Sequence, residues 1–123
     1  MKELLLVFAG GGLGSVARFG ISRLYGSWQS VFPFATLTAN FLSCIVFGLI
    51  IILSADKLSL SPLIKLLIIT GFCGGFSTYS SFTFETVQLF KNDSGLLAFS
   101  NILLNFFLSV SGLYLGMLLA KFF

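Results

Sequence analysis

The sequence predicts an all-α membrane protein with four transmembrane helices. Of its 123 residues, 57% are hydrophobic and only 9% are charged, and the mean hydropathy is +1.06. A water-soluble domain of this length is far less apolar. Nearly the whole chain falls into four apolar segments, each long enough for the ~20 residues that a spanning helix needs. We therefore expect one four-span transmembrane domain over residues 1–123, with no extramembrane domain to hold a catalytic centre.

The expected spans are residues 4–24, 34–53, 63–90 and 96–122. The first is not interpreted as a signal peptide, because no small-residue cleavage site follows it and Gly10-Gly11-Gly12 interrupts its apolar run. The loop before the second span contains Gly26, Trp28 and Pro33, which are typical of turns and of the membrane interface.

The third and fourth spans have clear boundaries. Pro62 suits the first turn of the third span. The polar run Lys91-Asn92-Asp93-Ser94-Gly95 predicts a turn before the fourth span, which then runs to the end of the chain.

The third span carries the most informative stretch, which reads Gly-Phe-Cys-Gly-Gly-Phe-Ser-Thr-Tyr-Ser-Ser-Phe-Thr-Phe from Gly71 to Phe84. Three glycines and a run of hydroxyls are poor helix formers. At membrane depth, irregular backbone survives only where it is buried in protein or lines a wet cavity. The stretch therefore predicts a helix break near residues 74–78, and such a break is a hypothesis about an ion or substrate site.

The basic residues are almost evenly divided between the two sides of the membrane. One side holds Lys2, Lys57, Lys65 and Lys121, and the other holds Arg18, Arg23 and Lys91. Orientation follows a bias in basic residues, so near balance predicts that the chain inserts both ways. Two opposed copies would form an antiparallel homodimer whose broken segments meet at its centre. Carbonyls freed by the break could then converge on one cation, and sodium fits that role.

Polar residues form stripes along the expected helices. Asn101, Asn105, Ser109, Gly112 and Gly116 share one face of the fourth span, and Thr36, Asn40 and Ser43 share one face of the second. Single hydroxyls and glycines usually pack helices together, and Gly10-x-x-x-Gly14 is interpreted in that way. An amide in hydrocarbon needs several partners, which makes Asn40 and Asn105 candidates for function.

The charged residues inside the spans favour an anion path. Intramembrane ionisable groups are functional candidates, although Glu85 and Arg18 both lie toward span ends, where they could snorkel or cap. The stripes are rich in donors and poor in carboxylates, and a cation path would normally carry carboxylate rings. Arg18 near a pore mouth would concentrate anions.

Several function classes are excluded or disfavoured. The chain has no histidine, and Cys44 and Cys73 are interpreted as packing residues rather than as a disulfide or metal site. No ATP-binding motif and no solvated basic patch for nucleic acid is visible. Most of the 16 phenylalanines must face lipid or the core. We therefore expect a non-enzymatic membrane protein.

Three stretches together give a family resemblance. They are Gly10-Gly11-x-x-Gly14-x-x-x-Arg18, Thr36-Leu37-x-x-Asn40, and the run from Gly71 to Phe82. With them, the chain resembles the Fluc (CrcB-type) fluoride channels along its whole length. The resemblance implies passive fluoride export across the bacterial plasma membrane, which reduces cytoplasmic fluoride toxicity. It also implies a dual-topology antiparallel homodimer with two pores.

The resemblance further implies a set of site residues. The fluoride path would include Asn40, Tyr79, Ser80, Ser81, Phe82, Ser109 and the vestibule residue Arg18. A structural sodium ion at the dimer centre would be held by the main-chain carbonyls of Gly74 and Ser77. The chain departs from the family at Tyr79, where phenylalanine is usual, and at Ser77 and Ser81, where threonine is common.

Two other functions remain as alternatives. A small multidrug-type, proton-coupled cation exporter is also a short four-span protein, but it needs an embedded glutamate in the first span, and here that span has only Glu3 at its start. A non-transporting membrane scaffold would explain the small packing residues, but not the predicted break or the buried amides.

Overall fold

The computed structural model describes all residues except Gln29, Leu58 and Ser59. It confirms the prediction of four helical segments long and apolar enough to cross a membrane. These segments are Lys2–Tyr25, Phe34–Ala55, Pro62–Lys91 and Gly95–Phe122. Within the described part of the chain there are helices and turns but no strands.

The first segment is α1 (Lys2–Tyr25), and the second is α2 (Phe34–Ile52), which continues into a π-helical turn over Leu53–Lys57. The third consists of α3 (Pro62–Lys65), a π-helical stretch over Leu66–Cys73, α4 (Gly74–Phe76) and α5 (Tyr79–Lys91). The fourth is α6 (Gly95–Leu119), which ends in a 3-10 turn over Ala120–Phe122.

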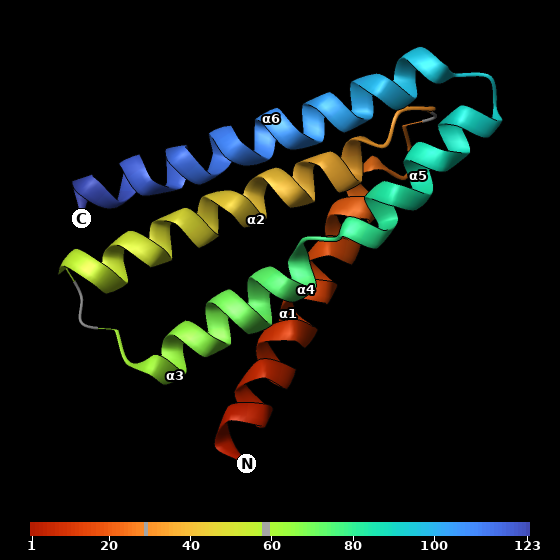
Figure 1. Ribbon diagram of the computed structural model, residues 1–123. Coiled ribbons are helices and arrows are strands. Elements are labelled where there is room, and N and C mark those ends of the chain that lie inside the picture. Colours follow the sequence, from red (N-terminus) through yellow and green to blue (C-terminus); the bar gives the residue numbers. More distant parts are fainter. Residues whose placement is uncertain (29, 58–59) are drawn as a thin grey trace.

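Figure 1 shows how these segments are arranged. Helices α2 and α6 run side by side along most of their length, and α1 crosses the third segment near α4. Both chain ends, the end of α2 and the start of α3 lie toward one end of the bundle. The α1–α2 loop and the α5–α6 turn lie at the other end, as expected for four successive crossings.

The helix ends follow the expected sequence signals. Pro62 is the first residue of α3, and the Ser61 side chain caps that helix by accepting a hydrogen bond from the Ile64 N–H at 3.3 Å. The turn between α5 and α6 contains Asp93 at φ +54°, a left-handed conformation that aspartate tolerates better than most residues.

Glycines allow close backbone contact where α1 crosses the third segment. A Cβ on Gly10 would lie 2.9 Å from the Phe72 nitrogen, and one on Gly14 would lie 2.7 Å from the Phe76 nitrogen. The Gly10-x-x-x-Gly14 face is therefore the contact that the sequence predicts. Between α2 and α6, Gly116 has the same role, because a Cβ there would lie 2.8 Å from the Leu49 nitrogen.

The polarity of the bundle is the reverse of that of a soluble domain. Large apolar side chains such as Phe8, Phe106 and Leu118 are exposed, while the largest fully buried side chain is Asn101. The fully buried hydrophobic side chains among the described residues are all small, namely Ala39, Ala98 and Ala120. An apolar outer surface of this extent fits a lipid environment, with a polar interior between the helices.

Candidate functional site

The third segment changes backbone conformation between α4 and α5. Ser77 has φ −77° and ψ 159°, and Thr78 has φ −152° and ψ 117°, so both are extended. The Ser77 N–H and hydroxyl both donate to the Cys73 carbonyl, at 3.0 and 2.8 Å. The Thr78 hydroxyl accepts from the Ser81 N–H at 3.2 Å and so caps α5. The Ser77 N–H thus keeps its helical bond, and the Ser77 and Thr78 hydroxyls add bonds at the end of α4 and the start of α5.

Asn40 on α2 binds the backbone of this interruption. Its Oδ1 accepts from the Thr78 N–H at 2.8 Å, and its Nδ2 approaches the Thr78 carbonyl oxygen at 3.4 Å. The amide thus meets both polar groups of one backbone residue, much as a neighbouring strand would. An unpaired N–H at this depth would be costly, so Asn40 stabilises the extended conformation.

A chain of hydrogen bonds continues from Asn40 into α6. Asn40 Nδ2 donates to Asn105 Oδ1 at 3.0 Å, and Asn105 Nδ2 donates to Asn101 Oδ1 at 2.8 Å. Asn101 Nδ2 donates to the Thr86 hydroxyl at 2.9 Å, and that hydroxyl donates to the Phe82 carbonyl at 2.8 Å. We call this chain, from Thr78 through Asn40, Asn105, Asn101 and Thr86 to Phe82, the amide relay.

A groove of about 370 Å³ runs beside the relay. Its lining residues are Asn40, Tyr79, Phe82, Ile102, Asn105, Phe106, Ser109 and Val110. A smaller hollow of about 220 Å³ shares Asn40, Tyr79 and Ser109 with the groove and extends it to Ser77 and Thr78. The structure therefore brings four of the predicted path residues, Asn40, Tyr79, Phe82 and Ser109, to one surface.

The two aromatic residues of the groove lie side by side. Their ring centroids are 5.5 Å apart, with an angle of 54° between the ring planes. The Tyr79 side chain is 80% exposed in the single chain, while Phe82 is half-buried. Much of the Tyr79 ring is thus open to whatever fills the groove or covers it.

The remaining predicted path residues lie outside the groove lining. The hydroxyls of Ser80 and Ser81 lie 3.3 and 3.2 Å from the Thr78 hydroxyl, so both form hydrogen bonds with the residue that caps α5. Arg18 lies on α1, and its Nε is buried without a hydrogen-bond partner among the described residues. The single chain therefore does not bring Arg18 to the groove.

Glu85 contacts α2 rather than its own helix end. Its Oε1 accepts from the Thr36 hydroxyl at 2.6 Å, and its Oε2 is buried without a partner in the described part of the chain. The reason is that α5 packs with Glu85 turned toward Thr36 on α2. The described residues thus show Glu85 paired with Thr36 near the start of α2, a partner that the sequence stripe did not reveal.

Gly74 and Ser77, the predicted sodium ligands, both line an open hollow of about 440 Å³. Because the Thr78 N–H bonds Asn40, the Gly74 carbonyl loses the donor that a continuous helix would supply four residues later. A Cβ on Gly74 would meet no atom within 4 Å, so the space beside it is open. The described residues contain no group of three histidine, cysteine, aspartate or glutamate side chains that could hold a metal.

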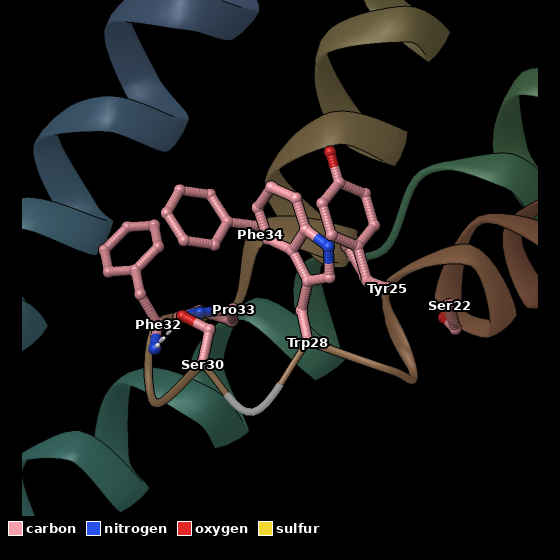
Figure 2. A pocket seen from close by; sticks show the side chains of 8 residues that line it. Ser22, Tyr25, Trp28, Ser30, Phe32, Pro33 and Phe34 are labelled. Atoms are coloured by element: carbon pink, nitrogen blue, oxygen red, sulfur yellow. Dashed lines mark hydrogen bonds between the residues drawn. The ribbon is translucent and has the colours of Figure 1, made fainter.

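A separate hollow of about 190 Å³ lies at the α1–α2 loop, and Figure 2 shows its aromatic walls. The Tyr25 and Trp28 rings meet edge to face at 5.6 Å, and Trp28 meets Phe34 in the same way at 6.4 Å. The Tyr25 hydroxyl lies 3.1 Å from that of Thr38 on α2. These contacts hold the loop against α2 at the end of the bundle, where aromatic residues suit a membrane interface.

Sequence reasoning assigned no role to two members of the relay, Asn101 and Thr86. Asn101 stands four residues before Asn105 on the polar stripe of the fourth span, and that spacing was the available signal. Thr86 gives no such signal, because hydroxyls on spanning helices commonly bond their own backbone.

Comparisons with known proteins cover nearly the whole chain. Residues 5–117 match the family model described as CrcB-like protein, Camphor Resistance (CrcB). A protein from Gloeothece citriformis is 40% identical over 122 residues, 98% of each chain, and one from Flavobacterium psychrophilum is 36% identical over the same shares. A protein from Pyrococcus abyssi is 36% identical over 121 residues, again 98% of each chain. All three relatives are named fluoride-specific ion channel FluC.

Proposed function

Because this chain belongs to the CrcB-like protein family, we propose that it is a channel that lets fluoride leave the cell passively. The observation that carries the proposal is the groove beside the amide relay, where the interrupted segment meets α2 and α6. The relatives named as fluoride-specific channels match the chain over almost its full length, which supports the same substrate here.

The chemistry of the groove suits a small anion. The polar groups among its lining residues are two amides and two hydroxyls, all able to donate hydrogen bonds, and none of the lining residues is a carboxylate. Fluoride is small and strongly hydrated, so it needs closely spaced donors in exchange for water. The ring edges of Tyr79 and Phe82 are electropositive and would add to these donors.

A passive channel is sufficient for export. Fluoride enters cells as neutral HF and dissociates inside, and the membrane potential then drives the anion outward. We therefore place the protein in the cell membrane as a multi-pass channel. We find no support for a proton-coupled cation exporter, because α1 carries only Glu3, in its first turn.

We further propose that two copies assemble as an antiparallel homodimer. The near balance of basic residues supports insertion in both orientations. In such a dimer the Ser77–Thr78 interruptions of both chains would meet at the centre, and the exposed face around Gly74 would be covered. Arg18 would then stand near a mouth formed by both chains.

The Gly74 and Ser77 carbonyls fit a structural sodium ion at that centre. The Gly74 carbonyl lacks its helical donor and has open space beside it, and sodium takes oxygen ligands. The ion would satisfy freed carbonyls from both chains and so stabilise the interruption.

The proposed function is tested by ion flux from liposomes. Purified protein should release fluoride when a potassium ionophore balances the charge, and it should release chloride far more slowly. Proton-driven uptake of a cationic drug without fluoride release would contradict the proposal.

A further inference from the structure

The amide relay has a fixed direction, because both of its ends are backbone groups. At one end, the Thr78 N–H can only donate, and at the other end, the Phe82 carbonyl can only accept. Between these ends, each amide must accept on the side nearer Thr78 and donate on the side nearer Phe82. The two backbone groups therefore set the order of donors and acceptors, and the Asn101 carbonyl, which accepts from Asn105 Nδ2, supports the same order.

This direction decides which side of the Asn40 amide is available to an anion. Asn40 Oδ1 is turned to the Thr78 N–H, so its Nδ2 lies on the side of Asn105, a residue of the groove. One Nδ2 hydrogen binds Asn105, but the other has only the Thr78 carbonyl at 3.4 Å, beyond the usual 2.7–3.2 Å range. That weakly bound hydrogen is a donor that an anion can use. The reversed amide would present an oxygen instead and repel the anion.

Asn105 is held in the matching orientation by Asn101. Asn105 Nδ2 donates both to Asn101 Oδ1 at 2.8 Å and to the Asn101 carbonyl oxygen at 3.1 Å. Asn101 is fully buried, at 0% exposure, and is not among the residues that line the groove. Its own amide is oriented by Thr86, whose hydroxyl gives its proton to Phe82 and is left to accept.

Resting on the proposed channel function, we propose that Asn101 and Thr86 are positioning residues of the fluoride path. They act through Asn105 to hold the Asn40 amide with its N–H groups, and not its oxygen, available to the anion. Without the Asn101 side-chain acceptor, only the Asn101 backbone carbonyl still holds Asn105 Nδ2, so Asn105 can more readily turn that group toward Asn40. Two donors then oppose each other, and Asn40 loses the acceptor that holds it on the groove side.

Thr86 offers a test by isosteric exchange. Thr86→Val keeps the shape but removes the hydroxyl, whereas Thr86→Ser keeps the hydroxyl. The matched control is Thr83→Val, because Thr83 makes the same type of bond to the Tyr79 carbonyl at 2.9 Å but is exposed and outside the relay. Each variant is reconstituted in liposomes, and fluoride release is separated into the fraction of vesicles with an active channel and the rate within them.

We expect Thr86→Val to lower the rate within active vesicles by about three- to tenfold, the effect of losing roughly one hydrogen bond. Thr86→Ser and Thr83→Val should keep the wild-type rate. A purely structural role would lower the fraction of active vesicles and leave the rate within them unchanged, and that result would overturn the proposal. A rate for Thr86→Ser as low as that for Thr86→Val would also overturn it.

Asn101 is tested by a double-mutant cycle with Asn105. Asn101→Leu should lower the rate within active vesicles, but it should add nothing further in an Asn105→Leu background, because its effect passes through Asn105. Ser100→Ala is the control, since its hydroxyl bonds only the Leu96 carbonyl among the described residues, at 2.8 Å. Additive effects of Asn101→Leu and Asn105→Leu would contradict the relay. Absence of fluoride release from wild-type protein would instead contradict the proposed function itself.

Discussion

The crossing of α1 and the third segment gives a prediction that two glycines, two residues apart and on different faces of α1, can test. Gly14 faces the backbone of the third segment, whereas a Cβ on Gly12 would meet no atom within 4 Å. Gly14→Ala and Gly12→Ala add the same methyl group to the same helix. Their gain in helix propensity, roughly 0.5–1 kcal/mol each, therefore cancels in the comparison.

The difference between the two variants can be worked out from the contact distances. A Cβ on Gly14 would lie 2.7 Å from the Phe76 nitrogen, and the Phe72 carbonyl oxygen would be closer still. Ordinary contact begins at 3.4 Å, so the two backbones must separate by at least about 0.7 Å. The neighbours are backbone atoms and cannot rotate away. Overpacking of this kind costs about 1–3 kcal/mol, so we expect Gly14→Ala to be less stable than Gly12→Ala by that amount.

The assay is thermal unfolding of the purified protein in mild detergent, followed by circular dichroism. A loss of 1–3 kcal/mol should lower the Tm of Gly14→Ala by at least a few degrees relative to Gly12→Ala. Gly12→Ala should melt at or slightly above the wild-type temperature. Equal melting of the two variants would refute the close crossing, because both glycines would then face open space.

The remaining predictions concern the ion path and the assembly. Phe82→Ile should cut fluoride flux strongly with the protein still folded, whereas Tyr79→Phe should be tolerated; wild-type flux in Phe82→Ile would show that the ring only packs. Asn40→Asp should also lower flux. It removes the Nδ2 donors and places a carboxylate oxygen against Asn105 Oδ1, which in the wild type accepts from Asn40. Wild-type fluoride release from liposomes would refute this. A reporter cysteine at Asn92, in a background without native cysteines, should be labelled by an impermeant reagent to about half from each side of the membrane. Labelling from one side only would exclude an antiparallel homodimer of this chain.

The four spanning helices follow from the sequence because hydropathy and turn residues act locally. Twenty apolar residues must form a helix in lipid, and the polar run around Asn92 can only lie outside it. The Gly10-x-x-x-Gly14 contact is also predictable, since small residues four apart mark a close helix crossing. The π-helical stretch over Leu66–Cys73 is not predictable in this way, because its residues are mostly apolar and Gly71 indicates a weak helix without indicating a π-helix.

The partners within the site depend on how the helices cross, and this the sequence does not reveal. Asn40 was recognised as a buried amide that needs several partners, but its partner proved to be the Thr78 backbone, 38 positions along the chain. For Glu85 the sequence leaves a functional role and an interfacial role open, and it does not predict the contact with Thr36. An amide or a carboxylate could bind many different polar groups. Only the packing of α2 against the third segment decides which group each of them meets.

The position of Asn101 and Asn105 on α6 has a consequence for how the protein is made. A chain synthesised from its N-terminus delivers α2 and the Ser77–Thr78 segment before α6. Until α6 is inserted, Asn40 Oδ1 can bind the Thr78 N–H but Nδ2 lacks its Asn105 acceptor, which leaves a donor poorly paired in hydrocarbon at a cost of about 1–3 kcal/mol. A chain that stops before its last helix therefore carries a polar defect in the bilayer.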